Sequence, residues 1–134
     1  MMFRPLFVML PAALWIWGCA GLTTNHAQTS PAHPDPTLRT RYVPGAYDAV
    51  FDAALAVSRA LPRWKITGQE RASGSILAER RTRLFKFVDD IRIDVTQADD
   101  GRVALNLSSK SRVGKGDFGQ NARNIREFLA AFPP

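Results

Sequence analysis

Residues 90–107 read DIRIDVTQADDGRVALNL, and this stretch decides the fold. Apolar residues occupy every second position over 91–95 and again over 103–107. Such alternation places one face of a strand in a core and the other face in solvent. The pair Asp100-Gly101 between the two halves is typical of a tight hairpin turn with positive φ angles. The stretch therefore predicts two antiparallel strands in a sheet that is covered on one side only.

Upstream of this hairpin, the pattern predicts one helix and two further strands. Residues 47–61 carry apolar side chains at helical spacing and are followed by Pro62, so we expect an amphipathic helix that ends there. Residues 63–68 and 75–82 have the character of strands, and the cluster 71–74 between them reads as a turn. These segments predict a second hairpin.

A last helix is expected downstream of the sheet. Apolar residues form a continuous stripe along residues 118–132. Asp117, with Gln120 three residues later, resembles a capping box with Asp117 as the N-cap, and Pro133 ends the helix. The sequence thus predicts one α+β domain over residues 42–134. It would hold a four-stranded antiparallel sheet with an N-terminal and a C-terminal helix packed on one face, in the order α-β-β-β-β-α.

The first 18 residues are typical of a secretory signal peptide. A short positive region precedes an uncharged apolar run, and the small residue Gly18 stands directly before Cys19, the only cysteine of the chain. The run is interrupted by Pro11 and is shorter than the about 20 apolar residues of a membrane-spanning helix. We expect export of the chain and lipidation of Cys19, which resembles the lipobox cysteine of bacterial lipoproteins. The alternative is ordinary cleavage after Ala20 or Ala27, with the cysteine discarded.

Residues 19–41 lack any apolar period, and they are rich in polar residues and proline. Such a composition predicts a disordered tether behind the lipidated cysteine. Both histidines, His26 and His33, fall in this stretch, and a metal site built from them would require the tether to become ordered, so no metal is expected. Together these features predict a lipoprotein of the cell envelope that faces the periplasm and is anchored in a membrane through Cys19.

The composition of residues 42–134 excludes several chemistries. They include no cysteine and no histidine, so their side chains cannot supply thiol catalysis, a Ser-His-Asp triad or ordinary zinc ligation. Residues 114–119 have the form G-x-G-x-x-G, but no second parallel strand follows to complete a dinucleotide site. We therefore expect no cofactor and no nucleotide. The full chain has a net charge of +6, and without Arg4 of the predicted signal peptide the charge is +5; in an exported protein such a charge suits anionic lipid headgroups better than nucleic acid.

Several polar residues are expected to gather at one edge of the sheet. The return from the last strand into the last helix would bring Ser111, Arg112 and Asn121 near the edge where Asp89 and Asp90 begin the neighbouring strand. We expect Asp89, Asp90 and Arg112 to interact as one network, which either specifies the fold or forms the floor of a small binding site. The full set of suspected residues is Asp89, Asp90, Ser111, Arg112, Asp117, Asn121 and Arg123.

Two segments carry a resemblance to a known family. Residues 87–91 read FVDDI and contain F-x-D-D, and residues 111–121 read SRVGKGDFGQN and contain S-R-x-G-x-x-D-x-G-x-N. These motifs resemble those of the bacterial family known as domain of unknown function 1499, over about residues 47–129. The resemblance implies an exported or membrane-associated protein, and it implies no reaction, cofactor or catalytic residue.

Three functions remain open on these observations. The first is a non-enzymatic module that binds a protein or another envelope component while anchored to a membrane. The second is a domain that binds a small ligand or anionic lipid, and the third is a carboxylate-dependent enzyme, which we do not expect. A flat exposed apolar patch would favour the module that binds an envelope component. A concave apolar pocket that reaches the polar residues would favour the domain that binds a small ligand or lipid. Two carboxylates in an open cavity would favour the enzyme.

Overall fold

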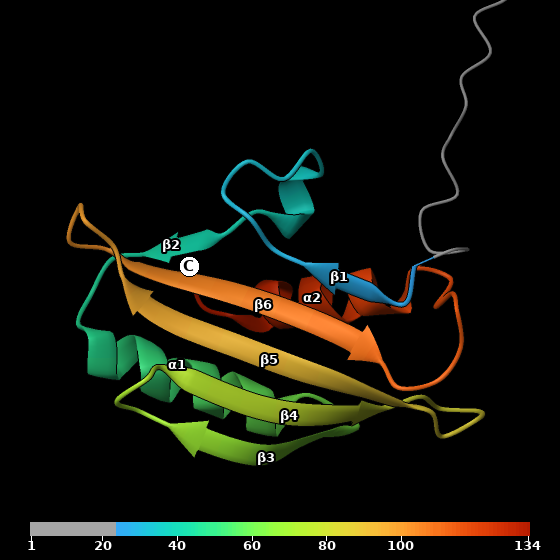
Figure 1. Ribbon diagram of the computed structural model, residues 1–134. Coiled ribbons are helices and arrows are strands. Elements are labelled where there is room, and N and C mark those ends of the chain that lie inside the picture. The colour runs from blue at the N-terminus through green and yellow to red at the C-terminus, as the bar shows by residue number, and fades with distance from the viewer. Residues whose placement is uncertain (1–23) are drawn as a thin grey trace, which may run out of the picture.

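A long hairpin lies at the centre of the sheet in the computed structural model, which describes residues 24–134 (Figure 1). Its strands are β5 (Val88–Gln97) and β6 (Val103–Ser111), which pair antiparallel along nearly their whole length. Gly101 adopts a φ of 84° in the turn between them, a conformation that glycine accepts without steric cost. The hairpin predicted from residues 90–107 is confirmed.

A second hairpin extends the sheet, and two helices cover one of its faces. β3 (Trp64–Glu70) and β4 (Ser75–Arg81) pair antiparallel, and β4 also pairs with β5. α1 (Tyr47–Ala60) and α2 (Gln120–Ala131) both lie on the same side of the sheet (Figure 1). The predicted α+β class, its two hairpins and its two helices are therefore confirmed.

The core lies between the two helices and the sheet. Alternate residues of the central strands, such as Ile93 and Leu105, are fully buried because they point toward the helices. Phe51 of α1 and Phe128 of α2 are equally buried and complete the core from the other side. Trp64 stacks on Phe128 with 6.1 Å between the ring centroids, so the first strand of the second hairpin is tied to the last helix.

The sheet has six strands rather than the predicted four, because two short strands line the outer edge of β6. β1 (His26–Gln28) and β2 (Arg41–Val43) each pair antiparallel with β6. Residues 29–40 leave the edge between them and contain the short 3-10 helix η1 (Pro36–Leu38). The strand order is β1-β6-β5-β4-β3, with β2 also beside β6. β1 and β2 thus form one edge strand that is interrupted in the middle.

The prediction of a disordered tether over residues 19–41 is wrong for the part that the structure describes. Hydroxyl groups of Thr29 and Thr40 both donate to Oδ1 of Asn106, at 3.3 and 2.7 Å, and so close the interruption in the edge strand. Leu38 is buried in the core. A segment of low hydrophobicity is ordered here because the edge of β6 offers unpaired backbone groups and the core accepts one apolar anchor.

Two predictions concern residues that the structure does not describe. The signal peptide of residues 1–18 and the lipidation of Cys19 lie outside residues 24–134. Within that described part, neither helix combines the length and the apolar character that crossing a membrane requires.

The turn between β3 and β4 packs tightly against β5 and α1. Gly74 has a φ of 72°, and its carbonyl oxygen accepts a hydrogen bond from Val95 N–H at 2.8 Å. A Cβ at this position would overlap the carbonyl oxygen of Val95. Tyr47 of α1 donates from its hydroxyl group to the carbonyl oxygen of Arg71 at 2.8 Å, and Arg71 pairs with Asp48 at 3.1 Å. The turn therefore has no room for any side chain at position 74.

Candidate functional site

The predicted polar cluster is divided between the two faces of the sheet. Asp89 and Ser111 are opposite each other in β5 and β6 and point toward the helices. Asp90 and Arg112 follow them in sequence and are exposed on the other face. Because successive side chains of a strand point to opposite faces, Asp89 and Asp90 cannot share one network. The prediction that Asp89, Asp90 and Arg112 interact as one network is wrong for Asp89, whereas Asp90 and Arg112 do pair with each other.

The residues on the helix side form a buried polar network. Asp89 is 1% exposed, and its Oδ1 accepts from Ser111 Oγ at 2.7 Å while its Oδ2 accepts from Asn124 Nδ2 at 2.8 Å. Ser109 Oγ accepts from Asn124 Nδ2 at 3.1 Å and donates to Asn121 Oδ1 at 2.6 Å. Both oxygens of the one carboxylate are thus used within the fold, which is the condition for burying such a group without large cost.

Arg80 adds a positive charge beside this network. It is opposite Asp89 in the pairing of β4 with β5, and it is 7% exposed. Burial lowers the pKa of Arg80, and the nearby carboxylates of Glu127 and Asp89 act in the opposite direction. Its Nε lies 3.7 Å from Glu127 and has no hydrogen-bond partner among the described residues. The charge of Asp89 is therefore part of what compensates Arg80 in the interior.

The second family motif also holds the start of the described chain. Asn121 Nδ2 and the backbone N–H of Ser111 both donate to the carbonyl oxygen of Asn25, each at 2.8 Å. The backbone N–H of Asp117 donates to the carbonyl oxygen of Thr24 at 3.2 Å. We call these contacts the N-terminal clamp. They fix residues 24–25 against the connection between β6 and α2.

Asp117 organises the first turn of α2, although the helix begins later than predicted. The cap is Gly119, with a φ of 77°, and the first helical residue is Gln120. Asp117 accepts from the backbone N–H groups of Gly119 and Asn121, each at 2.8 Å, so its carboxylate still serves the N-terminal end of the helix. The capping-box prediction is wrong in two respects, because the N-cap is Gly119 rather than Asp117, and because the Gln120 side chain bonds to Asn124 instead of reaching back.

The remaining suspected residues lie outside the buried polar network. Arg112 pairs with Asp90 through two hydrogen bonds of 2.6 and 2.9 Å and with Glu79 at 2.7 Å. These partners raise the pKa of Arg112, but the side chains of Arg112 and Asp90 are 47% and 52% exposed. Exposed pairs of this kind contribute little to stability. Arg123 is exposed and donates to the carbonyl oxygen of Phe118 at 3.0 Å.

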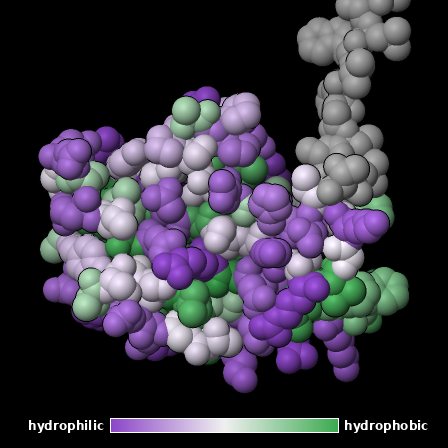
Figure 2. Space-filling model, viewed as in Figure 1, coloured by the Kyte–Doolittle hydropathy of each residue, from purple (hydrophilic) through white to green (hydrophobic). Residues whose placement is uncertain are grey.

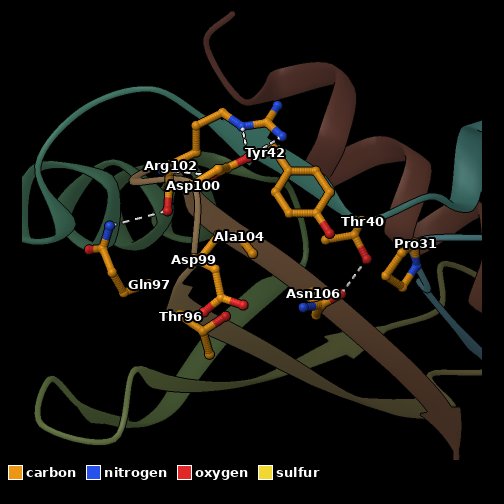
Figure 3. A pocket seen from close by; sticks show the side chains of 11 residues that line it. Pro31, Thr40, Tyr42, Thr96, Gln97, Asp99, Asp100, Arg102, Ala104 and Asn106 are labelled. Carbon is orange, nitrogen blue, oxygen red and sulfur yellow. Dashed lines mark hydrogen bonds and ion pairs between the residues drawn. The ribbon is translucent and has the colours of Figure 1, made fainter.

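The open face of the sheet carries a shallow depression of about 570 Å³ beside the turn between β5 and β6 (Figure 3). The guanidinium group of Arg102 lies over the ring of Tyr42, with its Cζ 4.6 Å from the ring centroid. Arg102 Nε also donates to the Asp100 carboxylate at 2.8 Å. Thr40 donates to Asn106 at 2.7 Å in the same depression. Many of its polar groups therefore already have partners within the protein.

A smaller cavity of about 320 Å³ lies between β1, η1 and α2. Its apolar lining comes from Ala27, Leu38 and Ala122, and it reaches Asp117 of the N-terminal clamp. We call it the N-terminal cavity. Its remaining lining residues include Thr24, His26, His33, Asp35, Gly119 and Arg126.

Asp35, at this cavity, has an unusually acidic carboxyl group. Hydrogen bonds from Thr37 and Arg126 lower its pKa from 3.8 to about 2. Because the pKa is depressed in the folded state, the carboxylate stabilises the fold above about pH 4, and this stabilisation is lost as the pH falls through about 2. We expect an NMR titration to give Asp35 a pKa near 2 and the variant Thr37→Val to raise it toward 3.8. An ordinary pKa in the unaltered protein would contradict this reading.

Five apolar side chains are exposed at the end of the sheet where the N-terminal clamp lies. Figure 2 shows green side chains gathered at this end. They come from two loops, residues 82–87 between β4 and β5 and residues 112–119 between β6 and α2, and we call them the apolar tip. The five residues are Leu84, Phe85, Phe87, Val113 and Phe118.

The set of site residues predicted from the sequence was incomplete. Arg80, Ser109 and Asn124 all take part in or face the buried polar network, and none was suspected. A signal was present, because Ser109 continues the core-facing alternation of β6 beyond Leu107. A polar residue at a core-facing position indicates a buried polar partner.

The comparisons with known proteins identify a family but no activity. No curated protein matches the chain. Within residues 24–134, no three side chains of His, Cys, Asp or Glu lie close enough together to hold a metal ion. A family model described as protein of unknown function (DUF1499) matches residues 21–132, which cover both motifs, the buried polar network and the N-terminal clamp. The chain therefore belongs to the DUF1499 family of proteins of unknown function.

Proposed function

We propose that the chain is a membrane-anchored lipoprotein of the cell envelope whose domain is a non-enzymatic binding module facing the periplasm. The N-terminal clamp carries this proposal. It fixes Thr24, which is five residues after Cys19, and an extended chain spans at most about 3.6 Å per residue. A lipid on Cys19 would then hold this end of the domain within about 18 Å of the anchor.

The use of the motif residues supports a binding module over an enzyme. Asp89, Ser111 and Asn121 are all at most 7% exposed and are bonded to one another or to the backbone of Asn25. A catalytic carboxylate needs access to its substrate, whereas these side chains join the N-terminal segment to the sheet and to α2. The apolar tip, by contrast, offers an exposed surface of the kind that marks interaction sites.

The test of the anchor is the state of Cys19 in cells. We expect mass spectrometry to find a mature N-terminus at Cys19 that carries lipid, and the protein to fractionate with membranes. In the variant Cys19→Ala we expect the lipid to be absent and processing to fail, because the lipidated thiol is gone. The neighbouring change Thr23→Ala is the matched control and should alter neither result. An unmodified chain that starts at another residue, with unchanged fractionation of Cys19→Ala, would refute the anchor.

A second candidate function is the binding of a small ligand, and the N-terminal cavity favours it. Its volume of about 320 Å³ lies at the lower end of the range for small-molecule sites, and its apolar lining reaches the polar group of Asp117. The side chain of Arg126 at the same cavity already pairs with Asp35 at 2.6 Å, so a ligand would have to compete for that charge.

A further inference from the structure

The two loops of the apolar tip lie side by side at one end of the sheet. The backbone N–H of Arg112 donates to the carbonyl oxygen of Val88 at 3.1 Å, and this bond joins the bases of the two loops. Thr24 is bound at the same end through Asp117. Figure 1 shows both loops at the end of the sheet where the described chain begins. The N-terminal segment and the apolar tip therefore share one end of the domain.

The apolar side chains of the tip are strongly exposed to solvent. Leu84 is 85% exposed, Phe118 75% and Phe85 73%, and Val113 and Phe87 are 60% and 47% exposed. Phe85 and Phe87 stack on each other with 5.5 Å between their ring centroids, which leaves their outer surfaces facing solvent. An exposed cluster of this size on a small domain marks a surface that is covered by something else.

Positive charges are interleaved with these apolar side chains. Residues 81–88 contain three basic side chains and no acidic one. A further basic residue, Lys115, lies in the second loop. Arg83, Lys86 and Lys115 are all exposed, and none of them takes part in an ion pair within residues 24–134. The carboxylate of Asp117 is directed to the first turn of α2. The tip therefore presents cations whose charge is not compensated by the protein.

We propose that the apolar tip inserts into the interface of a bilayer and that its basic residues bind anionic phospholipid headgroups. Large apolar side chains flanked by lysine and arginine are the composition of interfacial membrane anchors, with the charged groups reaching back to the headgroups. This inference rests on the proposed function, because a lipid on Cys19 would hold the same end of the domain toward the membrane.

The experiment uses the mature lipidated protein in vesicles of phosphatidylglycerol and phosphatidylcholine. A single cysteine is introduced by Leu84→Cys and labelled with an environment-sensitive fluorophore, since a lipidated Cys19 offers no free thiol. We expect a blue shift and a gain in emission, with quenching by brominated acyl chains. The variant Phe118→Cys provides a second position on the other loop. The matched control is Asp99→Cys, in the turn at the opposite end of the sheet, where we expect the emission of a probe in water.

The basic residues are tested by charge reversal in the same protein. The double variant Arg83→Glu and Lys86→Glu should lose the blue shift at position 84 on anionic vesicles while still floating with them. If the unaltered tip reports water although the protein floats with the vesicles, the inference is wrong and the proposed anchor stands. If the blue shift appears only after an envelope protein is added, the tip binds protein and the inference is also wrong.

Failure of the anchor gives a different result. The chain would then lack lipid in mass spectrometry, and Cys19 would either be absent after cleavage downstream of it or react with the fluorophore. In that case the unlipidated protein is mixed with anionic vesicles directly. Sedimentation with the vesicles that is lost in Leu84→Asp would support lipid binding by the tip without the proposed function, and absence of sedimentation would overturn both.

Discussion

Replacing Gly74 with alanine is expected to lower the free energy of unfolding by about 3 kcal/mol or more. Its φ of 72° is a left-handed conformation that costs a side-chain-bearing residue about 1–2 kcal/mol. The new methyl group would also overlap the carbonyl oxygen of Val95, and forcing atoms into a packed site costs about 1–3 kcal/mol. Urea denaturation followed by circular dichroism measures the loss.

Gly101 provides the matched control for this experiment. It also has a positive φ, of 84°, but a Cβ there would meet no atom within 4 Å. Gly101→Ala should therefore show only the conformational cost, and the difference between the two variants measures the overlap with Val95. Equal losses for Gly74→Ala and Gly101→Ala would mean that the turn between β3 and β4 can move away from β5.

Removal of the carboxylate of Asp89 should have the second large effect. Asp89→Ala would leave the Ser111 hydroxyl and the Asn124 amide without their acceptors, and it would leave Arg80 with less compensating charge. A buried donor left without its acceptor costs about 1–3 kcal/mol, so with two such donors we expect a loss of about 2–5 kcal/mol in urea denaturation. Asp90→Ala is the control on the opposite face, and it should change stability little because Asp90 is half exposed.

A double-variant cycle tests whether Arg80 belongs to the same unit. Arg80→Met alone leaves Asp89 without its nearby positive charge, whereas Arg80→Met with Asp89→Ala removes both buried charges. We expect the combined loss to be clearly smaller than the two single losses added together. Additive losses would mean that Arg80 is compensated by Glu127 and that Asp89 serves only its two hydrogen-bond donors.

Every helix or strand that has its own hydrophobic period could be predicted from the sequence. The alternation in β5 and β6 and the helical stripes in α1 and α2 are long enough to bury a face, and such periods are local information. β1 and β2 are three residues each, too short to show a period. They are ordered by pairing with β6, which is about 80 residues away for β1, and no local pattern records such a partner.

The polar residues could have been divided correctly with stricter use of the same rule. Asp89 is in phase with Ile91 and Ile93 on the core-facing side of β5, and Asp90 is in phase with the exposed Arg92. Their adjacency in sequence suggested one site, although adjacency in a strand means opposite faces. The sequence alone could not identify Asn124 as a hydrogen-bond partner of Asp89, because Asn124 lies in a helix and is 35 residues away in the chain.

The N-terminal clamp also has a consequence for the order in which the chain assembles. The bond between Asn25 and Asn121 joins residues that are 96 positions apart, and a contact that closes so long a loop forms late in folding. Synthesis delivers Asn25 long before the segment that holds it, so β1 has no partner while most of the domain is being made. We therefore expect the clamp to close last, after the final helix has emerged. If the chain is exported and processed at Cys19 as we propose, both steps would have that interval in which to act on a chain end that the folded domain has not yet bound.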